Sequence, residues 1–102
     1  MEDIKVIDFT GFEREFEFVA KVDGKYEEFK AYAEPKYKYD KYSDAIELII
    51  LNVKCSMYHD DLEKYVPCSL DKDELELLRQ AMSDAVDWDD IQDWILNFHN
   101  HN

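Results

Sequence analysis

The chain has 102 residues, of which 46% are hydrophobic and 15% aromatic, and its formal net charge at pH 7 is -13. This length fits a single domain over residues 1–102, and the aromatic content argues against a disordered acidic tail. No apolar run approaches the ~20 residues of a membrane-spanning helix and no signal peptide is evident, so we expect a soluble, cytoplasmic protein. The negative charge argues against nucleic acid and anionic membranes as direct ligands.

An antiparallel hairpin is predicted over residues 15–33, where two alternating segments flank the dipeptide Asp23-Gly24. An Asp-Gly pair supplies the positive φ angles of a two-residue type I′ turn, and this turn fixes the register of both strands. The register places Phe18 opposite Phe29 on one side of the sheet and opposite charges on the other side. Such pairs are typical of a stable strand register.

Three further segments complete the first two thirds of the chain. Residues 4–9 predict another strand, which ends at Thr10-Gly11. In the centre of residues 45–55, the side chains expected on both faces of a strand are apolar. This pattern predicts a strand that is covered on both faces. Residues 35–44 are polar and rich in tyrosine, and we expect them to form a connection.

The last third of the chain predicts two helices. Asp71 is the expected N-cap of the first, and Glu74, three residues later, completes a capping box. Apolar residues then recur at helical spacing as Leu75, Leu78, Met82, Ala85 and Val86. A second helix is expected to begin near Asp87, with its buried side formed by Ile91, Trp94, Ile95 and Phe98. Strands followed by helices indicate an α+β fold, in which an antiparallel sheet of about four strands packs against two C-terminal helices.

Acidic residues are concentrated in the predicted helices. From residue 71 to the C-terminus the chain has 9 acidic and 2 basic side chains. The face of the first helix opposite its apolar stripe presents Asp73, Glu76, Gln80, Asp84 and Asp87, and the second helix adds Asp89, Asp90 and Asp93. Neighbouring carboxylates on a helix repel one another. The pattern therefore indicates either a surface that imitates a row of phosphates, or a solubilising surface with some acids favoured near helix N-termini.

The segment Lys36–Tyr42 alternates lysines with tyrosines and is the most basic part of the chain. Aromatic side chains between cations can stack on unpaired bases. The overall negative charge argues against this use, and we expect Tyr37 and Tyr39 to pack on the sheet while Lys36 and Lys38 point outward. A role in protein contact also fits, because tyrosine is common at interface hot spots.

Metal binding and catalysis find little support in the sequence. His59, the pair Asp60-Asp61 and the terminal His99 and His101 match no metal-site spacing, so we expect neither a metal nor another cofactor. With 2 glycines the chain has no phosphate-binding glycine-rich loop, and its serines lie in no nucleophile-elbow context, so we expect a non-enzyme.

The two cysteines, Cys55 and Cys68, form no CxxC motif. A small secreted domain held together by disulfides usually carries more cysteines. Two reduced core thiols are therefore the favoured interpretation, and a single disulfide is the alternative.

In size, charge and aromatic content, though not in alignable motifs, the chain resembles two classes of small acidic α+β proteins. One class is the phage-encoded nucleic-acid mimics that block restriction or CRISPR machinery, and the other is the immunity proteins that neutralise toxic nucleases. The resemblance implies a non-enzymatic inhibitor that occupies the basic site of a nuclease or other nucleic-acid-binding protein.

The residues expected to bind such a partner are Asp73, Glu76, Asp84, Asp87, Asp89, Asp90 and Asp93, with Trp88 and Tyr58 as exposed aromatic contacts. Trp94 is instead expected in the core. The alternative is a structural or adaptor domain that binds a protein partner through its sheet or its tyrosine-rich segment. In that case the acidity serves solubility alone.

Overall fold

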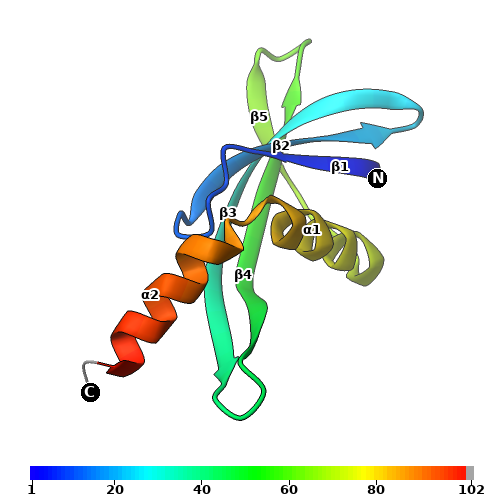
Figure 1. The fold of residues 1–102 in the computed structure, drawn as a ribbon. Coiled ribbons are helices and arrows are strands. Elements are labelled where there is room, and N and C mark those ends of the chain that lie inside the picture. Colours follow the sequence, from blue (N-terminus) through cyan, green and yellow to red (C-terminus); the bar gives the residue numbers. More distant parts are fainter. Residues whose placement is uncertain (101–102) are drawn as a thin grey trace.

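The fold consists of one antiparallel sheet of five strands with two C-terminal helices on one of its faces (Figure 1). The structure is a computed structural model, and it describes the backbone of residues 1–100 and the side chains of residues 1–98. The strands are β1 (Glu2–Ile7), β2 (Glu15–Val22), β3 (Lys25–Asp40), β4 (Ala45–His59) and β5 (Lys64–Cys68), and they lie side by side in chain order. The helices are α1 (Lys72–Ala85) and α2 (Trp88–Asn100). The predicted α+β fold is therefore confirmed, with one strand more than the expected four.

The β2–β3 hairpin has the predicted register from end to end. Asp23 and Gly24 form the turn with φ angles of 53° and 80°, as a type I′ turn requires. Phe18 lies opposite Phe29, and the two rings stack with their centroids 4.7 Å apart. Both side chains are fully buried, so the turn chemistry places a fully buried aromatic pair in the core.

Strand β3 continues to Asp40, so the prediction of a connection beginning at Pro35 is wrong; only residues 41–44 form a turn. A proline lacks the N–H donor of a strand and is tolerated where one side of the strand has no neighbour. Strand β2 ends its pairing opposite Tyr32, so Pro35 lies where β3 pairs with β4 alone. Tyr37 and Tyr39 point inward and are half-buried, as predicted, while Lys36 and Lys38 are exposed.

A bulge in β4 changes which of its residues face the helices. Between the pairs Tyr32–Lys54 and Glu34–Leu51, β4 advances one residue more than β3, and Asn52 has a φ angle of 53°. The inward side chains are Ile46, Leu48 and Ile50 before the bulge and Val53, Cys55 and Met57 after it. Ile49 and Leu51 point outward and are 36% and 38% exposed. The expectation that both faces of this strand are covered is therefore wrong.

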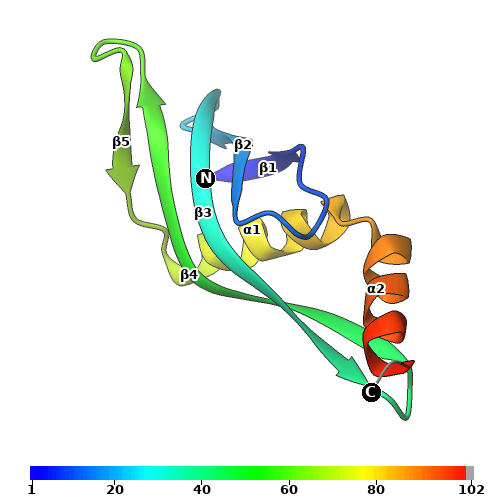
Figure 2. The same cartoon turned by 90° about the vertical axis from the view of Figure 1, so that its left-hand side faces the viewer.

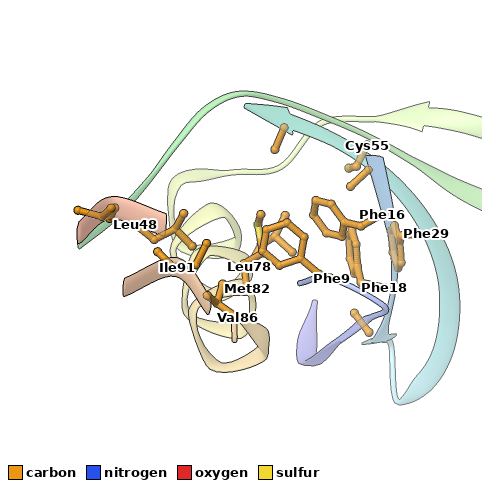
Figure 3. Packing of buried hydrophobic residues seen from close by; sticks show 14 residues of the cluster. Phe9, Phe16, Phe18, Phe29, Leu48, Cys55, Leu78, Met82, Val86 and Ile91 are labelled. Atoms are coloured by element: carbon orange, nitrogen blue, oxygen red, sulfur yellow. The ribbon is translucent and has the colours of Figure 1, made fainter. Parts of the chain in front are cut away.

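Both helices lie on the inner face of the curved sheet, and no element within residues 1–100 covers the outer face (Figure 2). Helix α1 contacts β1, and α2 runs along the far end of the β3–β4 hairpin, which extends past the other strands. The molecule is elongated, with extents of 53 × 22 × 20 Å. Its core lies between the sheet and the helices, and its largest fully buried side chains are Phe18, Phe29, Leu78, Met82 and Ile91 (Figure 3).

The capping box of α1 is present as predicted. The backbone N–H of Glu74 donates to the Asp71 carboxylate at 2.8 Å, and the backbone N–H of Asp71 donates to the Glu74 carboxylate at 3.1 Å. Asp87 caps α2 in a related way, because its carboxylate accepts the backbone N–H of Asp90 at 3.3 Å. Both helix starts are therefore encoded by aspartates that satisfy unpaired backbone donors.

Three residues assigned to the apolar sides of the helices are not buried. Leu75 is 38% exposed, Trp94 is 52% exposed and Phe98 is 61% exposed. The reason for the last two is the narrow surface beneath α2. That surface is a two-stranded hairpin, which covers Ile91 and Ile95 and leaves the flank of the helix open.

Candidate protein-binding surface

The seven acidic residues predicted to bind a partner all lie on the surface of the helical layer. The residues are Asp73 and Glu76 near the start of α1, Asp84 near its end, Asp87 between the helices, and Asp89, Asp90 and Asp93 on α2. Every one of them is exposed. The structure therefore places all seven carboxylates where a partner can reach them.

Local interactions account for two of these carboxylates. Glu76 accepts a bidentate hydrogen bond from Arg79, with Nε 3.2 Å from Oε2, and this contact lowers the pKa of Glu76. Such exposed pairs contribute little to stability. Asp87 is the N-cap of α2, so capping alone explains its presence. Neither residue by itself indicates a partner.

The helix dipole accounts for three more. Asp73 lies in the first turn of α1, and Asp89 and Asp90 lie in the first turn of α2. Carboxylates are favoured at these positions because the N-terminus of a helix carries partial positive charge. These residues add to the negative field of the surface, but their location has a structural explanation.

Asp84 and Asp93 have no such explanation. Asp84 lies in the last turn of α1, where the dipole favours cations, and this turn contains no basic residue. Its carboxylate accepts a hydrogen bond from Gln80 Nε2 at 3.2 Å, an exposed contact between neighbours on the helix. Asp93 lies beyond the first turn of α2 and is exposed. These two residues are the ones that a role in binding explains better than helix stability does.

The two aromatic residues predicted to be exposed contacts are both half-buried. The indole N–H of Trp88 donates to the Ser83 carbonyl oxygen at 2.9 Å, and its ring meets Tyr37 edge to face at 5.9 Å. Tyr58 packs edge to face on Tyr65 at 5.2 Å, on the outer face of the sheet. Trp88 therefore supports the join between α2 and the sheet, and the sheet separates Tyr58 from the acidic helices.

Three other aromatic residues, Phe12, Trp94 and Phe98, are exposed on α2 or beside it. Tyr37, Tyr39, Trp94, Ile95 and Phe98 line a groove of about 330 Å³ between β3 and α2, which we call the α2 groove. Phe12 borders it, with its ring meeting that of Trp94 edge to face at 5.8 Å. Phe12 is 50% exposed, close to the exposure of Trp94. The sequence offered one signal for this groove, since the apolar side assigned to α2 is wide and includes two large aromatic rings.

Acidic residues lie on both elements that form the α2 groove. Asp90 precedes Trp94 by one helical turn, and Asp93 is its neighbour in the chain. On the strand side, the phenol of Tyr39 donates to the Asp44 carboxylate at 2.6 Å, and this hydrogen bond raises the pKa of Tyr39. The sequence of α2 contains neither lysine nor arginine. The surface thus combines apolar rings with negative charge, a combination that suits arginine and lysine side chains.

The residues considered for metal binding are not brought together. Within residues 1–98, whose side chains are described, no three His, Cys, Asp or Glu side chains group as metal ligands would. Asp60 and Asp61 lie exposed in the turn between β4 and β5, next to His59 at the end of β4. The side chains of His99 and His101 are outside the described part of the chain.

Within the described part of the chain, no helix has the length and apolar character needed to cross a membrane.

Comparisons with protein-family models, with curated proteins and with solved structures gave no match for this chain. Any function must therefore be inferred from the surface itself. Its defining features are the exposed carboxylates of α1 and α2 and the aromatic rings of the α2 groove.

Proposed function

We propose that this protein is a non-enzymatic inhibitor that binds the basic nucleic-acid site of a partner protein through α1 and α2. The observation that carries the proposal is the position of Asp84 and Asp93. Both are exposed carboxylates that neither capping nor the helix dipole explains. Together with the other acidic residues of the helical layer, they give this surface a negative electrostatic potential. Self-repulsion of this kind is disfavoured unless packing or a positively charged partner offsets it.

The spacing of the acidic side chains supports docking on a surface built for nucleic acid. The Cβ atoms of residues one helical turn apart lie about 5–6 Å from each other, comparable with the few ångströms between charges along a nucleic-acid strand. A groove lined by lysine and arginine would meet a similar field from either ligand. Complementary charge of this type raises the association rate and makes it sensitive to salt.

The α2 groove supplies the apolar part of the proposed interface. Binding energy is usually concentrated in a few aromatic or arginine side chains at the centre of an interface, with charged residues around them. Trp94 and Phe98 take this role in the proposal, in place of Trp88 and Tyr58. The groove lies on the same helix as Asp90 and Asp93, so one partner surface can contact both features.

The proposal is tested with two charge-reversal variants that change the net charge equally. The first carries Asp84→Lys and Asp93→Lys in the helical layer. The second carries Asp60→Lys and Asp61→Lys in the β4–β5 turn, at the opposite end of the molecule from α2 (Figure 1). Each variant and the wild type are immobilised and exposed to a lysate of the source cell and its hosts. Retained proteins are then eluted with rising salt or with duplex DNA.

The proposal predicts that the wild type and the turn variant retain a nucleic-acid-binding protein that salt and DNA both release, while the helix variant loses it. Equal loss in both variants would mean that only the total charge matters. Retention that neither salt nor DNA affects would contradict the proposal.

The outer face of the sheet favours a second candidate function, that of an adaptor domain. No described element covers this face, which exposes Ile49, Leu51 and Tyr26, while Tyr42 in the β3–β4 turn is 90% exposed. Tyr37 and Tyr39 point toward the helices instead, so they do not belong to this surface. An adaptor that binds here would lose its partner in an Ile49→Lys, Leu51→Lys variant and keep it in the helix variant.

A further inference from the structure

Cys55 and Cys68 are direct partners across the β4–β5 ladder. Their Sγ atoms are 2.9 Å apart, although the residues are separated by 13 positions in the chain. Directly opposed residues of antiparallel strands have Cα atoms about 4.5–5.5 Å apart, within the range of about 4.4–6.8 Å found for disulfides. We propose that this pair is a redox modification site, at which two thiols close reversibly to one intrachain disulfide.

The two thiols differ in access to solvent, which sets the order of the reaction. Cys55 is 6% exposed, and burial, together with its contact to Cys68, raises its pKa to about 12. Cys68 is only half-buried and lies at the end of β5. A hollow of about 480 Å³ is lined by both cysteines and by Ser69 and Leu70. A small oxidant therefore reaches Cys68 first, because the thiolate is the reacting form and Cys55 resists ionisation.

The oxidant required is a low-molecular-weight disulfide such as oxidised glutathione. The thiolate of Cys68 attacks one sulfur of this disulfide, whose S–S bond breaks and releases one glutathione thiolate. Cys55 then gives up its proton and attacks the sulfur of Cys68, which releases the second glutathione. Two cysteine thiols are oxidised, one glutathione disulfide is reduced to two thiols, and the two protons pass to the departing thiolates.

The disulfide would fix the point where the chain leaves the sheet. Only Ser69 and Leu70 separate Cys68 from Asp71, the N-cap of α1. The bond would close the loop formed by the end of β4, the turn and β5. Closing a loop stabilises a protein chiefly by restricting the unfolded chain. The oxidised form should therefore unfold at a higher temperature, with the start of α1 held more firmly against the sheet.

The test uses the full chain equilibrated in buffers with different ratios of oxidised to reduced glutathione. Free thiols are trapped with an alkylating reagent and counted by mass spectrometry of the intact protein. We expect a monomer lighter by two hydrogens that takes up no reagent, a higher melting temperature, and full return of both thiols on reduction. Two alkylatable thiols in the most oxidising buffer would overturn the proposal. A disulfide found only between two chains would also overturn it.

Single-cysteine variants test the order of attack. The Cys55→Ser variant retains Cys68 and should form a stable mixed disulfide with glutathione, whereas the Cys68→Ser variant should react at least tenfold more slowly. Circular dichroism of both variants checks that they fold. Should either variant fail to fold, the wild type is used instead. Peptide mapping during its oxidation shows which cysteine first carries glutathione and how fast the mixed disulfide on Cys68 forms. A mixed disulfide that first appears on Cys55 would contradict the proposed order.

Discussion

The phenol of Tyr37 donates a hydrogen bond to the backbone carbonyl oxygen of Gly11, with the two oxygen atoms 2.9 Å apart. This contact joins the far end of β3 to the loop between β1 and β2. Gly11 is buried there with a φ angle of 110°, and Val86 and Ile91 of the helical layer also approach it. One position thus brings together the sheet, the loop and the helices that carry the candidate binding surface.

Replacing Gly11 by alanine should destabilise the protein strongly. The added Cβ would lie 2.7 Å from the Tyr37 phenol oxygen and 3.1 Å from Ile91, and the positive φ angle would strain any side chain. These two effects together should cost about 2 kcal/mol or more of the free energy of unfolding. Gly24→Ala is the matched control, because Gly24 also has a positive φ angle but no atom within 4 Å of the added carbon. Its cost should be about 1 kcal/mol, from backbone strain alone.

Urea denaturation of the two glycine variants measures this difference. Equal losses of stability would show that Gly11 is needed only for its backbone conformation. A larger loss for Gly11→Ala would show that the close approach of Tyr37 and Ile91 also matters.

Tyr37 should contribute to a fall in the stability of the protein in strong alkali. Burial raises the pKa of Tyr37 to about 12, from its usual value of 10.0. The folded state therefore holds this proton more tightly than the unfolded state does. The stabilisation is complete below pH 10 and is lost as the pH rises toward 12.

Tyr37→Phe should be less stable than the wild type at neutral pH, by about 1 kcal/mol for the lost hydrogen bond, but less sensitive to alkali. Tyr42→Phe is the control, because it removes a phenol that is 90% exposed. The measurement is the free energy of unfolding of the wild type and both variants between pH 9 and pH 12. Parallel profiles for the wild type and Tyr37→Phe would refute the assignment to Tyr37.

The two tryptophans should separate stability from binding. Trp88 is half-buried and hydrogen-bonded to Ser83, so Trp88→Ala should cost about 2–4 kcal/mol of the free energy of unfolding. Trp94 is 52% exposed, so Trp94→Ala should cost about 1 kcal/mol, chiefly from its contact with Phe12. If the α2 groove is the centre of the interface, Trp94→Ala should nevertheless weaken partner binding at least tenfold.

Fluorescence provides a check that needs no partner. In the wild type, the emission that acrylamide quenches most readily should come from Trp94, and it should be lost in Trp94→Phe and retained in Trp88→Phe. Similar quenching in both single-tryptophan variants would contradict the difference in exposure.

The features predicted correctly from the sequence are those that depend on a few neighbouring residues. Asp23-Gly24 specifies its own turn, and that turn fixes the register down to the Phe18–Phe29 pair. The capping box of α1 depends in the same way on Asp71 and Glu74 alone. Local backbone chemistry was therefore sufficient for the hairpin and for the start of the first helix.

The predictions that failed depend on how far each strand extends and on how much of a helix the strands beneath it can cover. Residues 35–44 were expected to form a connection because they are polar and rich in tyrosine, but β3 continues to Asp40, past the point where β2 stops pairing opposite Tyr32. Trp94 and Phe98 have the spacing of core residues, but the hairpin beneath α2 is too narrow to cover them. Their exposure follows from the relative lengths of the strands, which no local pattern specifies.

The candidate site was likewise predictable only in part. The acidic residues could be identified because charge and helical spacing are properties of the sequence. The capping role of Asp87 and the ion pair of Glu76 required the structure, and both reduce the number of carboxylates that need a partner to explain them. The Cys55–Cys68 pair depended on the β4–β5 register, which the turn at residues 60–63 did not indicate.

The most direct test of the proposed function is the association rate with the nucleic-acid-binding protein retained in the capture experiment, measured by stopped flow at several salt concentrations. The variants are again Asp84→Lys with Asp93→Lys, and Asp60→Lys with Asp61→Lys. Asp87 is left unchanged because it caps α2. The proposal predicts that at low salt the helix variant associates at least tenfold more slowly than the turn variant, and that high salt removes most of this difference. Equal association rates for the two variants at low salt would contradict the claim that α1 and α2 form the binding surface.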